Sequence, residues 1–121
     1  MRIFTRVLDS THGKSAVGVP ARLARARDNG WATVADAETD HDGRIPEWES
    51  RFLERGLYRI VFDSDDYFTR RGMVAAYPEV VVIFRIQKGV HFFQLQVTLA
   101  PYSYSTYFGT MDIRLRKNNS E

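Results

Sequence analysis

The chain has 121 residues, of which 44% are hydrophobic and 26% charged, so it is the length of one domain and has the composition of a globular protein. A total of 17 Lys and Arg against 15 Asp and Glu gives a formal net charge of +2, too small to favour nucleic acid as a partner. The absence of cysteine excludes disulfides, thiolate zinc sites and cysteine nucleophiles. No apolar run has the roughly 18 residues of a membrane span and the first residues do not resemble a signal peptide, so we expect a cytoplasmic protein with no membrane partner.

Apolar and polar residues alternate along most of the first half of the chain, which is typical of β-strands. The alternation predicts strands at 3–8, 19–27 and 31–37. Asp28-Asn29-Gly30 supplies a tight turn for a hairpin between the last two, because Asn and Gly adopt positive φ at little cost. The segment 47–55 is ambiguous: Trp48, Phe52 and Arg55 would share one face of a helix that Gly56 ends.

The second half shows the same alternation with one helix signal. Strands are predicted at 57–62, 80–86 and 91–99, and the last two are expected to form a second hairpin across Gln87-Lys88-Gly89. The stretch Asp63-Ser64-Asp65-Asp66 suits a helix N-cap with acidic first-turn residues, followed by a short helix over 67–71. A final strand is expected at 102–106, extended by the alternating residues 111–115. The pattern predicts a mainly β fold, a two-sheet sandwich with one short helix.

The candidate metal and nucleophile signals are weak. Residues 38–49 imitate a calcium loop, but Glu38 stands at the first position, Pro46 lies inside the loop, and a strand instead of a helix precedes it. His12, His41 and His91 lack metal-ligand spacing, and no serine lies in a Gly-x-Ser-x-Gly sequence. We therefore predict no metal and no cofactor.

Several segments taken together resemble one known family. They are Thr5 to Asp9, Gly13 to Leu23, Asp40 to Arg44, Gly56 to Asp63, Tyr67-Phe68, Tyr77 to Val80 and, most specifically, Leu99 to Thr110. In this order they resemble the transthyretin and 5-hydroxyisourate hydrolase family, from about residue 3 to residue 110. The resemblance implies a sandwich of about eight strands with one short helix, in a domain over 1–110 followed by an extension or tail over 111–121.

The resemblance also implies an assembly. Members of the family form homotetramers whose two ligand sites lie in a channel between dimers. Strand 80–86 and the last strand are then the edges that pair between subunits, which would protect them from uncontrolled association. A small-molecule substrate or ligand is the expected partner.

The hydrolases of this family open the ring of 5-hydroxyisourate by attack of water at a ring carbonyl, with two histidines, an arginine and a C-terminal Tyr-Arg-Gly-Ser. The family arginine matches Arg44, but the histidines fall on Arg6 and Gln94. In the terminal sequence Tyr107 and Gly109 are retained, whereas Phe108 replaces arginine and Thr110 replaces serine. The implied catalytic set is Arg44, Arg6, Gln94, Tyr107 and Thr110, and the implied substrate-binding set is Arg6, Arg44, Gln94, Phe108 and Gly109.

The two histidine replacements change the chemistry that this set can perform. Neither a guanidinium nor an amide accepts a proton from water near pH 7, and loss of one positioned base costs on the order of 10² to 10⁴ in rate. Arg6 and Arg44 instead suit a small, planar, anionic ligand, with Gln94 as donor or acceptor and Phe108 as an apolar wall. His91 differs from Gln94 by an odd number of residues, so only a bulge would bring it to the same face.

Three functions remain open from the sequence. The chain is an enzyme with an altered site that hydrolyses, cyclises or rearranges an anionic heterocycle, a carrier like transthyretin, or a residual 5-hydroxyisourate hydrolase. Purely structural roles are the alternative for three of these residues. In that interpretation Arg6 pairs with an acidic neighbour, and Tyr107 and Thr110 contribute to packing and to hydrogen bonds between strands.

Overall fold

Eight strands and two short helices make up the part of the chain that the computed structural model describes, residues 2–87 and 92–111. The strands are β1 Arg2–Asp9, β2 Lys14–Ser15, β3 Pro20–Arg27, β4 Gly30–Glu38, β5 Gly56–Phe62, β6 Val80–Ile86, β7 Phe92–Ala100 and β8 Ser103–Met111. The helices are α1 Pro46–Glu49 and α2 Ser64–Thr69. Neither helix comes close to the length needed to cross a bilayer.

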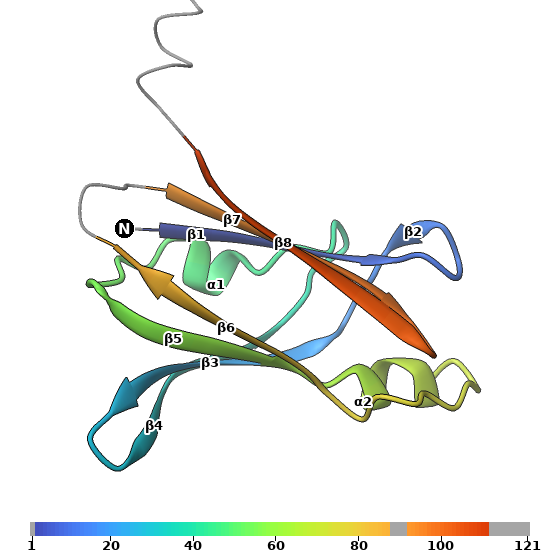
Figure 1. Ribbon diagram of the computed structural model, residues 1–121. Coiled ribbons are helices and arrows are strands. Elements are labelled where there is room, and N and C mark those ends of the chain that lie inside the picture. Colours follow the sequence, from blue (N-terminus) through green and yellow to red (C-terminus); the bar gives the residue numbers. More distant parts are fainter. Residues whose placement is uncertain (1, 88–91, 112–121) are drawn as a thin grey trace, which may run out of the picture.

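The strands form two four-stranded sheets that face each other (Figure 1). Sheet A has the order β2-β1-β7-β8, and sheet B has the order β4-β3-β5-β6. All strand pairs are antiparallel except β1 with β7, which run parallel over eight residue pairs from Arg2↔Phe92 to Asp9↔Leu99. The mainly β, two-sheet fold predicted from the alternation is confirmed, with a second short helix in addition to the expected one.

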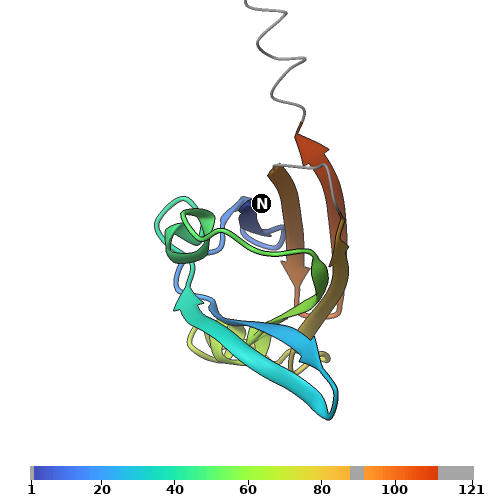
Figure 2. The same cartoon turned by 90° about the vertical axis from the view of Figure 1, so that its left-hand side faces the viewer.

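The core lies between the sheets because the central strands β1, β5 and β7 bury every second side chain. Among its largest fully buried side chains are Trp48, Tyr58, Phe62 and Leu95. Helix α1 lies along one side of the sandwich, away from the side where β6 and β8 lie (Figure 2). It is fixed there by Trp48, whose Nε1–H donates to the buried Thr5 Oγ1 at 3.1 Å.

A buried polar cluster ties α2 to the end of β1. Asp9 Oδ2 lies 2.6 Å from both Tyr67 Oη and His12 Nδ1, and the His12 backbone N–H donates to Asp9 Oδ1 at 2.9 Å. Burial opposes ionisation of Asp9, but the hydrogen bonds from Tyr67 and His12 outweigh it and hold the pKa of this carboxyl below its ordinary value. Burial, reinforced by the neighbouring carboxylate, raises the pKa of Tyr67 to about 12.

The structure resolves the ambiguous segment 47–55, and it shows that one expected strand pairing was wrong. The segment 47–55 forms a helix only within α1, and Phe52 is 73% exposed. The expected hairpin between 80–86 and 91–99 does not form, since β6 pairs with β5 in sheet B whereas β7 pairs with β1 and β8 in sheet A. Alternation determines which face of a strand is buried, not which neighbour it pairs with. The position of His91 and the expected strand extension over 112–115 fall outside the described residues.

Candidate functional site

Four polar side chains form a transverse row on the outer face of sheet A. The buried residues of β1 are Ile3, Thr5, Val7 and Asp9, so Arg6 points outward. Arg6 forms an isolated bridge with Arg44 on one side and pairs with Gln96 on the other, and Gln96 pairs with Tyr107. With strands about 4.8 Å apart, this polar row (Arg44, Arg6, Gln96 and Tyr107) spans roughly 14 Å.

Arg44 reaches this row because a tight turn precedes it. Asp40 Oδ1 accepts from the backbone N–H groups of Asp42 and Arg44, both at 2.9 Å. Burial opposes ionisation of Asp40, but these two donors hold its pKa below the ordinary value. Gly43 has φ +76°, and a Cβ there would collide with the Val7 carbonyl, so the close approach of the turn to β1 requires glycine.

Arg44 is held in a bidentate ion pair with Glu49 at the end of α1. Its Nε lies 3.0 Å from Oε1 and its Nη2 2.6 Å from Oε2, and the Glu49 side chain is only 12% exposed. The hydrogen bonds and the charge of Glu49 raise the pKa of Arg44. Glu49 therefore orients Arg44 and offsets much of its charge.

Arg6 is in a different electrostatic position. Within residues 2–87 and 92–111 it makes no ion pair, and its one polar side-chain contact is a long hydrogen bond from Nη2 to Ser15 Oγ at 3.4 Å. This does not support the alternative that Arg6 serves an acidic neighbour. Arg6 supplies the positive charge of the polar row that is left for a ligand.

Gln94 and Gly109 lie in the adjacent row of the same face. Phe4 pairs with Gln94, and Gln94 pairs with Gly109. A Cβ built on Gly109 would lie 2.5 Å from Tyr107 Oη and 3.0 Å from Tyr107 Cε1. The Tyr107 ring therefore lies over the bare backbone of Gly109, which brings its hydroxyl from the polar row into the row of Gln94.

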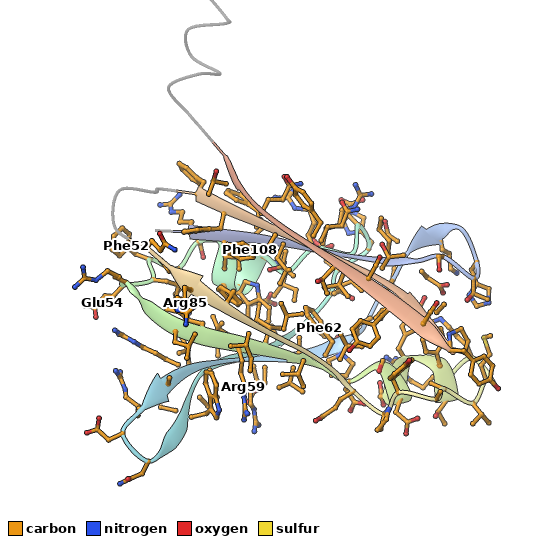
Figure 3. The ribbon with its side chains drawn as sticks, in the orientation of Figure 1. Phe52, Glu54, Arg59, Phe62, Arg85 and Phe108 are labelled. Atoms are coloured by element: carbon orange, nitrogen blue, oxygen red, sulfur yellow. The ribbon has the colours of Figure 1, made fainter. Side chains whose placement is uncertain are left out.

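Phe108 and Thr110 do not join these residues. The ring of Phe108 packs on the core, with centroids 5.1 Å from Phe84 and 5.2 Å from Phe93. Figure 3 shows Phe108 between the two sheets. The prediction that Phe108 forms an apolar wall beside Arg6 was wrong, because 107 and 108 point to opposite faces of β8. Thr110 pairs with Phe93 and shares the parity of Phe108, so it does not lie on the face of Arg6 either.

Gln96 is the residue of this face that sequence reasoning missed. It lies two positions after Gln94, so strand parity alone places both on one face and was sufficient to find it. Of the predicted residues, Arg6, Arg44 and Tyr107 meet in the polar row, and Gln94 and Gly109 lie beside it. This arrangement offers N–H and O–H donors and, among the residues that the structure describes, one cation without an ion-pair partner, Arg6. The carboxylate that contacts the arrangement, Glu49, is already paired with Arg44.

Comparison with known proteins identifies relatives over nearly the whole chain. The model of the HIUase/Transthyretin family matches residues 3–109. The 5-hydroxyisourate hydrolase of Pseudomonas aeruginosa is 34% identical over 115 residues, covering 90% of this chain and 91% of that protein. The mouse (Mus musculus) 5-hydroxyisourate hydrolase is 36% identical over 109 residues, covering 88% and 92%.

Solved structures give the same result. Sea bream transthyretin in complex with thyroxine superposes with a TM-score of 0.86 at 25% identity, covering 93% of this chain and 98% of that one. The 5-hydroxyisourate hydrolase of Klebsiella pneumoniae gives a TM-score of 0.79 at 28% identity, covering 91% and 100%. The chain therefore belongs to the HIUase/transthyretin family.

Proposed function

We propose that the chain is a hydroxyisourate hydrolase-like enzyme with an altered site on the outer face of sheet A. Its substrate is a small, planar, anionic heterocycle, on which it performs ring hydrolysis, cyclisation or rearrangement. The observation that carries this proposal is the polar row, in which Arg6, which has no ion-pair partner within residues 2–87 and 92–111, lies beside an oriented arginine, an amide and a phenol.

The residues of the row have separable roles in this proposal. Arg6 binds the negative charge of the substrate and stabilises the oxyanion that forms when water attacks a ring carbonyl. Arg44, held by Glu49, contributes its remaining N–H donors at a fixed position. Gln94, Gln96 and Tyr107 hydrogen-bond the ring edges, which orients the substrate in its plane.

General-base catalysis does not have an evident residue in this row. Glu49 is a poor candidate because both of its oxygens already accept hydrogen bonds from Arg44 and its side chain is only 12% exposed. Catalysis by positioning and electrostatic stabilisation therefore suits the row better than proton abstraction. This favours a substrate that is already reactive, such as one that also decays without an enzyme.

A carrier function is the second candidate. The offset charge of Arg44 and the absence of an imidazole from the polar row favour binding without turnover, and one solved relative is a transthyretin in complex with thyroxine. In that case the same face holds its ligand unchanged. Retained 5-hydroxyisourate hydrolysis is the third candidate, since the relatives at 34% and 36% identity carry that name.

One experiment separates the three candidates. Freshly generated 5-hydroxyisourate is followed with and without protein, beside a panel of cyclic ureides and imides that carry a carboxylate or enolate, and each compound is also tested for binding by calorimetry. Turnover of a panel compound that Arg6→Gln lowers at least tenfold supports the proposed enzyme. Binding with full recovery of the compound supports the carrier, and acceleration confined to 5-hydroxyisourate supports the ancestral reaction.

The matched control for this experiment is Arg51→Gln, an exposed arginine in the loop after α1. Arg51→Gln removes the same charge from the protein without touching sheet A. Equal loss in Arg6→Gln and Arg51→Gln would contradict the proposal, because it would show an effect of net charge alone.

We further propose that the active protein is a homotetramer in which the outer faces of sheet A from different subunits enclose the site. β6 and β8 lie at sheet edges, and the outer face exposes Tyr107 (60%) beside the stacked rings of Phe4 and Phe92, whose centroids are 5.6 Å apart. Light scattering of the purified chain tests this. A monomer at working concentration would contradict it.

A further inference from the structure

The outer face of sheet B carries a second, separate group of charges that make no ion pair in the part of the chain that the structure describes. An open depression of about 550 Å³ is lined there by residues of β3, β4, β5 and β6 and of the loops that follow β5 and precede β6. The outer faces of the two sheets point away from each other (Figure 1). The depression is therefore independent of the polar row and of the function proposed for it.

Arg59 supplies the cationic end of this depression. Figure 3 shows Arg59 on the side of sheet B that faces away from the core. Its guanidinium stacks on Trp31 with Cζ 4.7 Å from the ring centroid, and its buried Nε–H has no hydrogen-bond acceptor among the described residues. Since a buried donor without an acceptor is costly, a ligand oxygen that reaches this guanidinium gains a charge-assisted hydrogen bond.

Two carboxylates supply the opposite end. Asp63 and Glu79 both line the depression, and neither makes an ion pair in the described part of the chain. Phe62 pairs with Val80, so the register continued by one residue brings Asp63 opposite Glu79. Like charges that face each other across strands are destabilising, and a cationic group of a ligand would relieve that repulsion.

The space between the two ends is apolar or neutral. Val61 and Val81 pair across β5 and β6 and both line the depression. Arg22 and Asp36, which also line it, cancel each other in a bidentate ion pair at 2.7 and 3.1 Å. Asp63 follows Arg59 by four positions along β5 and the residue after it, which corresponds to about 13 Å between their Cα atoms.

We propose that this depression binds a short zwitterionic ligand, with a carboxylate on Arg59 and an ammonium group between Asp63 and Glu79. The two ligand charges lie about 10 Å apart, which an extended tripeptide with free termini spans. The aliphatic body of the ligand covers Val61 and Val81. Trp31, stacked on Arg59, reports directly on occupancy of the cationic end.

The test uses trialanine as the probe, with N-acetyl-trialanine and trialanine amide as blocked forms that each lack one charge. Binding is followed by Trp31 fluorescence and by amide shifts of Val61 and Val81 at ligand concentrations up to about 50 mM, since two exposed charge contacts supply millimolar affinity. Trialanine is expected to bind, and each blocked form is expected to bind about tenfold more weakly.

Matched variants locate the two charges. Arg59→Gln should weaken trialanine binding about tenfold, and this variant should bind trialanine and trialanine amide with equal affinity. Glu79→Gln should weaken trialanine binding to the same extent, and it should bind trialanine and N-acetyl-trialanine with equal affinity. Asp63→Asn keeps the N-cap of α2 while removing the charge, so it tests Asp63 without unfolding the helix. Arg51→Gln is the control and should bind trialanine as the unmodified chain does.

The proposal is overturned if trialanine causes no shift at Val61 and Val81, or if the blocked and free peptides bind equally. It is also overturned if Arg59→Gln and Arg51→Gln behave alike. Folding of every variant is checked by circular dichroism, and failure of this test leaves the proposal for the polar row unaffected, because the two sites lie on opposite outer faces.

Discussion

Placing histidines at positions 6 and 94 should accelerate 5-hydroxyisourate hydrolysis by this chain. Arg6 pairs with Gln96, so position 94 is its diagonal neighbour on the same face, with Cβ atoms roughly 7–8 Å apart. Two imidazoles at that spacing can flank one small ring. The double substitution Arg6→His, Gln94→His therefore tests the proposal that the histidines of the hydrolases correspond to positions 6 and 94 of this chain.

The expected gain follows from the value of a positioned base. One such group contributes about 10² to 10⁴ in rate, which corresponds to about 2.7–5.4 kcal/mol of activation free energy. The fold should tolerate the change within about 0.5 kcal/mol, because both residues are exposed and Arg6 loses only its 3.4 Å contact with Ser15. The double variant should therefore accelerate the reaction at least 10²-fold over the unmodified chain.

The assay follows the ultraviolet decay of 5-hydroxyisourate generated in place from urate, against a blank without protein. The matched control is Arg2→His, Thr98→His, which adds two imidazoles to β1 and β7 on the same face but six residue rows, about 20 Å, from each other, so that they cannot flank one small ring. The reasoning is refuted if a folded double variant is no faster than this control. It is equally refuted if the unmodified chain already matches the Pseudomonas aeruginosa enzyme.

Three further predictions concern single residues. Phe108→Arg, which restores the family's terminal sequence, should lower the free energy of unfolding by about 2–4 kcal/mol in urea titrations, because the half-buried ring packs on the core; an unchanged midpoint would contradict this placement. Tyr67→Phe should cost about 1–2 kcal/mol at pH 7, since it removes a donor to Asp9. Because the fold lowers the pKa of Asp9 below its unfolded value of 3.8, the ionised carboxylate stabilises the fold above that pH, and this contribution is lost as the pH falls. The stability difference between Tyr67→Phe and the unmodified chain should therefore shrink below about pH 4, and a difference that grows would contradict the role assigned to Asp9. Gly109→Ala should displace the Tyr107 ring and weaken ligand binding about tenfold, and Tyr107→Phe should weaken it to the same extent. If only Gly109→Ala weakened binding, the Gly109 backbone and not the Tyr107 hydroxyl would be the binding group.

The strands could be predicted from the sequence because each carries its own signal. The bounds of β6 agree with the prediction at both ends, and Asp63 caps α2 through a hydrogen bond from the Asp66 N–H at 3.0 Å. Pairing between strands carries no such local signal. The assignment of β6 and β7 to different sheets depends on which edges remain free once β5 and β1 are in place.

The site residues also fall into two groups, those that a local sequence signal places and those that depend on tertiary contacts. The alternation of side chains along a strand is sufficient to place Arg6 and Gln94 on the outer face of sheet A. The same rule places Gln96 on that face and Phe108 on the opposite one. The ion pair of Arg44 with Glu49 could not be foreseen, since it depends on a one-turn helix that Trp48 anchors to Thr5. The stacking of Arg59 on Trp31 could not be foreseen either, because it joins side chains of β5 and β4, which are not adjacent in sheet B.

The parallel pairing of β1 with β7 has a consequence for the order in which the chain folds. Sheet B consists of β3 to β6, which follow one another in the sequence, so none of its pairings joins residues more than 41 positions apart. The centre of sheet A instead joins the first strand to the seventh, about 90 residues later in the chain. During synthesis β1 must therefore wait, unpaired along that edge, until β7 has left the ribosome. Sheet B is then the half that folds first, and the face that carries the polar row is assembled last.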